Sequence, residues 1–161
     1  MSLLRAAALG KIAGCAGTVA LDVTTYLDML VRGRPASDVP SEFIKKLAET
    51  AGIAALTADD DAARNRRSAA GALVGYPTGL TVGAAFGIVR PALRGVPPLL
   101  AALAVGAAAM ALADVPLARA GVTDPKTWGT AGWLADIVPH VVYGLTVVAV
   151  FDAISANGER E

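Results

Sequence analysis

Three side chains capable of acid–base chemistry follow one another along a single helical stripe. Asp136, His140 and Tyr143 are separated by four and then three residues, which places them on one face of a helix. An aspartate beside a histidine can exchange a proton near neutral pH, because the imidazole titrates in that range. With a further carboxylate, the pair could also ligate a divalent metal ion. The alternative is structural, with polar side chains fixing the register of neighbouring helices by hydrogen bonds.

A second group of polar residues occurs nearer the start of the chain and in another apolar segment. Asp22 and Tyr26 are one helical turn apart. A charged side chain in a membrane span costs roughly 2.5–3.5 kcal/mol, so it usually points into the bundle and finds a partner. We therefore expect Asp22, Asp136 and His140 to meet. The candidate ligand or proton site comprises Asp22, Tyr26, Tyr76, Asp136, His140 and Tyr143.

The sequence lacks the signatures of several common enzyme and binding sites. It contains no glycine-rich phosphate loop, no GxSxG motif and no paired-histidine zinc motif. A single cysteine excludes an internal disulfide and a multi-cysteine metal site. The formal net charge is zero and no basic run carries interleaved aromatic residues, which argues against nucleic-acid binding. We expect no cofactor and no resident metal, and an enzymatic activity is possible only through the Asp136 and His140 site.

The composition places the polar residues within a membrane protein. Hydrophobic residues make up 55% of the chain but aromatic residues only 5%, so most of the apolar content is Ala, Val and Leu. About 20 apolar residues cross a hydrocarbon core of about 30 Å. Residues 68–89 and 95–113 contain no charged side chain, and Asp114, which closes the latter run, is expected among the lipid headgroups. A soluble domain of buried Ala-rich helices is the alternative. The sequence predicts a single all-α membrane domain with spans at residues 6–30, 68–89, 95–114 and 128–151.

The connection between the first two spans is predicted to contain a helix of its own. Within residues 41–56, apolar side chains recur at helical spacing, while Glu42, Lys45 and Lys46 occupy other faces. We expect an amphipathic helix on the membrane surface or packed on the bundle, with an ordinary connecting helix as the alternative. The side of this connection carries nine Lys and Arg residues against five on the side of the termini. The positive-inside rule then predicts termini outside and the connection in the cytoplasm.

Glycines recur at every fourth position of the second predicted span. In water each costs about 1 kcal/mol relative to alanine in a helix, so helix propensity does not explain them. Small residues do allow two helix backbones to approach closely in lipid, as in a glycine zipper. Matching glycines in the first span allow the two spans to pair in antiparallel orientation. The alternative is that the glycines of the second span mediate self-association of the protein. The predicted helix-packing glycines are Gly10, Gly14, Gly71, Gly75, Gly79, Gly83 and Gly87. The pairing sets these residues opposite one another: Gly10 and Gly87, Gly14 and Gly83, Asp22 and Gly75.

Two segments carry a resemblance to known proteins. "GTVALDVTTYLDMLVRGRPASDVP" and "DPKTWGTAGWLADIVPHVVYG" resemble the two most recognisable blocks of small, uncharacterised four-span membrane proteins of high-GC actinobacteria. The likeness extends over nearly the whole chain. It implies a helical bundle in a bacterial plasma membrane and implies no activity.

Two classes of function fit the sequence. In the first, the protein is an accessory or assembly subunit that packs its small-residue faces against a larger membrane complex or another copy of itself. In the second, it is a small oligomeric transporter or channel, whose Asp/His site handles protons or a small polar ligand. The half of the bundle around Lys11 offers no obvious polar path, which favours the first class.

Overall fold

The computed structural model describes residues 1–93 and 95–157, and within them every regular element is helical. In chain order the elements are α1 (Leu3–Arg32), α2 (Val39–Ala51), α3 (Ala54–Thr57), α4 (Asp61–Val89), the 3₁₀ turn η1 (Arg90–Leu93), α5 (Pro98–Arg119), the 3₁₀ turn η2 (Pro125–Thr127) and α6 (Thr130–Asn157). Among these, α1, α4, α5 and α6 are long and apolar enough to cross a membrane. The predicted all-α bundle is therefore confirmed, and its composition fits an integral membrane protein. Arg94 and Arg160, counted in the charge comparison, lie outside the described residues.

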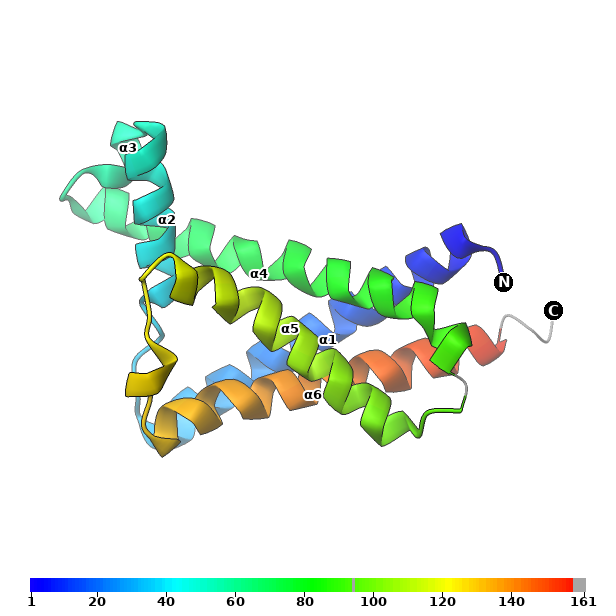
Figure 1. Cartoon of the computed structure of the whole chain (residues 1–161). Helices are drawn as coiled ribbons and strands as arrows, with labels where there is room; N and C mark the ends of the chain where they lie inside the picture. The colour runs from blue at the N-terminus through cyan, green and yellow to red at the C-terminus, as the bar shows by residue number, and fades with distance from the viewer. Residues whose placement is uncertain (94, 158–161) are drawn as a thin grey trace.

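The helices alternate in direction along a common axis. The N-terminus and the last described turns of α6 lie at one end of the bundle, whereas α2 and α3 lie at the other (Figure 1). Helix α1 packs most extensively against α4 and α6, and α5 packs mainly against α6. Contacts between α4 and α5 are sparse. Helix α1 is therefore the element shared by the two halves of the bundle.

The connection between α1 and α4 differs from its predicted form. Helix α2 ends at Ala51, not at residue 56, because Gly52 adopts a left-handed conformation with φ +69° and its N–H caps the helix. Helix α4 begins at Asp61, seven residues before the predicted span, because the side chain of Asp60 accepts a hydrogen bond from the backbone N–H of Ala63 at 2.6 Å. Two extra turns of α4 therefore extend the apolar span toward α2 and α3.

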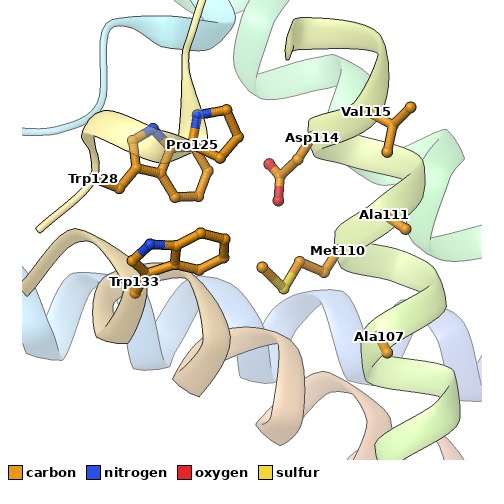
Figure 2. A pocket seen from close by; sticks show the side chains of 8 residues that line it. All are labelled: Ala107, Met110, Ala111, Asp114, Val115, Pro125, Trp128 and Trp133. Atoms are coloured by element: carbon orange, nitrogen blue, oxygen red, sulfur yellow. The ribbon is translucent and has the colours of Figure 1, made fainter. Parts of the chain in front are cut away.

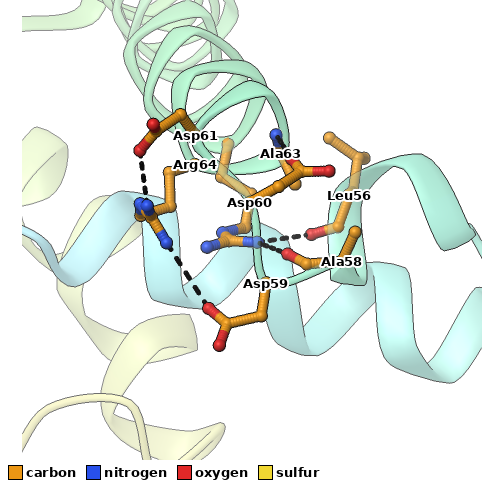
Figure 3. A network of polar contacts seen from close by, with 8 residues as sticks. Leu56, Ala58, Asp59, Asp60, Asp61, Ala63 and Arg64 are labelled. Carbon is orange, nitrogen blue, oxygen red and sulfur yellow. Dashed lines mark hydrogen bonds and ion pairs between the residues drawn. The ribbon is translucent and has the colours of Figure 1, made fainter.

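A polar network fixes this extension of α4. The guanidinium of Arg64 lies between Asp59 and Asp61 and pairs with both carboxylates (Figure 3). One turn later, the buried Arg67 donates to the carbonyl oxygens of Leu56, at 2.9 Å, and of Ala58, at 3.2 Å. These bonds hold the short α3 segment against α4. Arg67 therefore links two segments within the chain.

The backbones of α1 and α4 approach each other directly at their glycines. A Cβ atom built on Gly83 would lie 2.6 Å from the Cα of Gly14, and one on Gly87, beside Gly10, would overlap with the carbonyl oxygen of Ala6. Real Cβ atoms do not come that close to backbone. Only glycine fits at these positions, and the antiparallel register is the one read from the sequence.

The first two glycines of the α4 repeat, Gly71 and Gly75, do not contact α1. Gly71 faces α2, where an added Cβ would lie 2.9 Å from the backbone of Pro40. At Gly75, no described residue of another helix has an atom within 4 Å of an added Cβ, so the expected pairing with Asp22 is wrong. A four-residue repeat drifts by about 40° per step, or about 160° from first to last, and therefore cannot face one neighbour throughout.

A second close contact joins α5 to α6 and was not foreseen. A Cβ atom built on Gly144 would lie 2.7 Å from the backbone N of Gly106, and one on Gly106 would lie 2.5 Å from the carbonyl oxygen of His140. These glycines are 38 residues apart and belong to no regular stripe, so spacing alone does not reveal them. They bring the polar segment of α6 against α5.

The end of the bundle near the N-terminus is closed by an aromatic pair and an ion pair. The rings of Phe86 and Phe151 meet edge to face, with centroids 5.5 Å apart. Beside them, the guanidinium of Arg90 binds both carboxylate oxygens of Asp152, at 2.9 and 2.6 Å. This two-point contact ties the end of α4 to the end of α6.

We predict that Gly83→Ala lowers the free energy of unfolding by about 1–3 kcal/mol, because the added methyl group meets backbone that cannot move aside. Gly75→Ala is the matched control: it should leave stability unchanged or raise it by up to about 1 kcal/mol, since the added methyl group enters open space. Thermal unfolding of both variants in detergent micelles measures the difference. Equal stability of the two variants would contradict the backbone contact.

We further predict that Arg90→Lys lowers the free energy of unfolding by about 1–2 kcal/mol, although it conserves the charge. A lysine cannot make the two parallel hydrogen bonds to Asp152. Arg64→Lys, at an exposed ion pair, should change stability by less than about 0.5 kcal/mol. The same unfolding assay compares them, and an Arg90→Lys protein as stable as Arg64→Lys would show that the ion pair does not hold α4 to α6.

Candidate functional site

Asp136 and His140 form the local pair that their spacing predicts. The ring atom Nδ1 of His140 lies 2.8 Å from the carbonyl oxygen of Asp136 and 3.3 Å from its Oδ1 atom. Because a carbonyl oxygen only accepts, Nδ1 carries a hydrogen and Nε2 is the free acceptor when the ring is neutral. Both side chains are mostly covered, with 14% of His140 and 21% of Asp136 exposed. The pair is built for hydrogen bonding inside the bundle.

The third member of this group is Asp114, not Asp22. Helix α5 continues past Asp114 to Arg119, so the residue is not the helix end that the sequence indicated. Its half-buried carboxyl lies beside that of Asp136 and interacts electrostatically with both Asp136 and His140. Within the described chain, the Oδ2 atoms of Asp114 and Asp136 are both buried without a hydrogen-bond partner. The carboxyl–imidazole cluster is therefore Asp114, Asp136 and His140.

Asp22 lies in a different environment. Its carboxyl oxygen is 3.5 Å from the hydroxyl of Tyr76 on α4, and the structure of residues 1–93 and 95–157 records no hydrogen bond or ion pair from Asp22 to α6. The expectation that it meets the α6 pair is wrong. The α1 face that contacts α6 includes Gly17, and Asp22, five residues later, points about 140° away from it.

The two remaining tyrosines have opposite environments. Tyr26 is 65% exposed on α1, on the same side as Asp22. Tyr143 is fully buried where α1, α4 and α6 cross, and its hydroxyl donates to the carbonyl oxygen of Gly79 at 2.6 Å. Its ring fits there because Gly17 and Gly79 carry no side chains. The predicted polar stripe on α6 thus divides into a carboxyl–imidazole cluster and a tyrosine that locks the bundle.

Comparisons with protein-family models, with curated proteins and with solved structures found no match. The geometry therefore has to be interpreted on its own. Across residues 1–93 and 95–157, no group of three or more His, Cys, Asp or Glu side chains is arranged to hold a metal ion. What the carboxyl–imidazole cluster can do is hold or pass a proton and attract positive charge.

Sequence reasoning missed Asp114 because it treated the first charge after an apolar run as the end of the helix. The available signal was the apolar sequence that follows, since Val115, Leu117 and Ala118 continue the helical pattern. Proline usually disfavours the interior of a helix. In the structure Pro116 lies within the last turn of α5, and its carbonyl oxygen accepts from the N–H of Ala120 at 2.9 Å.

We predict that Tyr143→Phe lowers the free energy of unfolding by about 1 kcal/mol or more, because it leaves the ring in place and removes the hydrogen bond to Gly79. Tyr26→Phe removes the same hydroxyl from an exposed position and should have no measurable effect on the isolated protein. Chemical or thermal unfolding in micelles provides the measurement. If both variants unfold like the wild type, Tyr143 does not lock the three helices.

Proposed function

We propose that the protein is an accessory or assembly subunit of a bacterial plasma membrane, which packs against a helix of a larger membrane protein. The contact would use the face of α1 and α4 that carries Asp22, Tyr26 and Tyr76, called here the polar flank. The observation that carries the proposal is that Tyr26 and Tyr76 lie exposed on apolar helices, and that the chain covers the carboxyl group of Asp22 only in part. The α1–α4 glycine contact would act as an internal zipper that presents this flank.

The depth of the polar flank makes lipid an unfavourable neighbour. Tyr76 is nine residues beyond Arg67, and Asp22 is ten residues before Arg32, or about 14–15 Å along each helix. If both arginines lie at the level of the membrane–water interface, the two groups lie near the middle of a core about 30 Å thick. A carboxyl group at that depth usually faces protein or water, because hydrocarbon offers it no hydrogen bond. A neighbouring protein helix supplies such partners.

The adjoining part of α4 supports the same interpretation. Residues 72–77 are exposed on every side, between a contact with α2 at Gly71 and one with α1 at Gly79. Gly75 lies in the middle of this segment, and no other helix of the described chain has an atom within 4 Å of the position that a Cβ would take there. An uncovered glycine lets another helix come close, and Tyr76 beside it offers a hydroxyl at the contact.

Site-specific photo-cross-linking in the native membrane tests this function. A photoreactive amino acid in place of Gly75 should give one discrete cross-linked product with a larger membrane protein. The same group in place of Leu4, which is exposed on α1 away from the flank, serves as the matched control and should not give that product.

The cross-link should weaken at least about tenfold in Asp22→Leu, since the partner loses the polar group that it covers, while the helical content and thermal unfolding of the purified variant stay unchanged. A product with the mass of two copies of this chain would instead assign the flank to self-association. A Gly75 product that persists in Asp22→Leu, or no product at all, would overturn the accessory role.

A further inference from the structure

A cavity of about 250 Å³ lies between α5, η2 and the first turns of α6, away from the polar flank. Its walls include the indole rings of Trp128 and Trp133, the side chain of Met110 and the carboxyl group of Asp114. Figure 2 shows the two rings on one side and Asp114 with Met110 facing them from α5. The cavity therefore combines two indole rings with a carboxyl group. The carboxyl–imidazole cluster alone does not offer this combination.

The two indoles form a corner. Their centroids are 5.1 Å apart and their planes are inclined by 58°. Trp128 is held in place by a hydrogen bond from its Nε1–H to the hydroxyl of Thr123 at 2.8 Å. The faces of indole rings are electron-rich and attract a cation within about 6 Å of the centroid. A single positive group seated in the corner can therefore contact both rings.

The opposite wall is short of positive charge. Asp114 and Asp136 are neighbours, and His140 alone among the described residues forms an ion pair with either carboxylate. Asp114 itself has no ion-pair partner among the described residues. The Oδ2 atom of Asp114 is buried and has no hydrogen-bond partner in the described chain. A cation in the cavity would supply the ionic partner that Asp114 lacks within the described chain.

We propose that this cavity binds a small organic ammonium group through Trp128, Trp133 and Asp114. The volume lies below the roughly 300–1,000 Å³ of cavities that enclose drug-sized molecules, so the ligand is an amine or quaternary ammonium of few atoms. A lipid headgroup and a free amine share this chemistry. The proposal uses none of the residues of the polar flank and does not depend on the accessory role.

Fluorescence tests the proposal directly, because Trp128 and Trp133 are the only tryptophans of the chain. The purified protein, in a maltoside detergent that contains no amine, is titrated with choline at constant ionic strength. We expect a saturable change in tryptophan emission. The neutral isostere 3,3-dimethylbutan-1-ol should produce no saturable change, because it has the same shape without the charge. Equal responses to choline and to the alcohol would overturn the proposal.

Two variants identify the residues responsible. Asp114→Asn keeps the shape of the side chain and should weaken choline binding about tenfold or more, whereas Asp59→Asn, exposed and remote from the cavity, should leave it unchanged. Trp133→Phe keeps Trp128 as the reporter and should weaken binding several-fold, which preserves the test if Asp114→Asn fails to fold. Unchanged choline affinity in a folded Asp114→Asn protein, or in Trp133→Phe, would contradict the assigned site.

Reconstitution distinguishes the two sources of the ammonium group. In phosphatidylglycerol vesicles the response to choline should persist. In phosphatidylcholine vesicles it should disappear if lipid headgroups already occupy the cavity, and it should remain if the ligand is a free amine. A response that is absent from both phosphatidylglycerol vesicles and detergent would overturn the site.

Discussion

The direct contact between the backbones of α1 and α4 determines much of this structure. At Gly10, Gly14 and Gly83 the two helices approach so closely that any side chain would overlap with backbone. Lipid provides little hydrophobic force to press helices together, so close packing of this kind must hold them. Because α1 is fixed against α4 along one face and against α6 along another, it sets the positions of these two helices directly and that of α5 through α6.

This arrangement also separates the polar residues into two places. The face of α1 that meets α6 is lined by small residues and filled by Tyr143, so the carboxyl group of Asp22 is directed toward α4 instead. Asp136 and His140 are brought to α5 by the second glycine contact, at Gly106. The apolar helices therefore carry a polar flank at one face and a carboxyl–imidazole cluster at another.

The sequence was sufficient for the four long apolar helices, which follow from uncharged apolar runs, and for the α1–α4 register, which follows from the spacing of glycines. It was insufficient wherever the outcome depended on the direction of a side chain around a helix. An error of one residue rotates a side chain by about 100°, which is enough to move Asp22 from one neighbour to another. The position of Asp114 depended on where α5 ends, which the sequence did not predict. The α5–α6 contact depends on two isolated glycines that belong to no repeat and therefore could not be recognised from spacing.

The exposed segment of α4 between Gly71 and Gly79 is fixed at both of its ends, by Pro40 of α2 and by Thr18 of α1. Beyond Gly71, the buried Arg67 attaches the helix to the carbonyls of the α3 segment. The uncovered residues thus form a short helical segment that is held at both ends. A molecule that docks on this segment meets a surface whose conformational entropy was already lost when the protein folded, so little additional ordering opposes association.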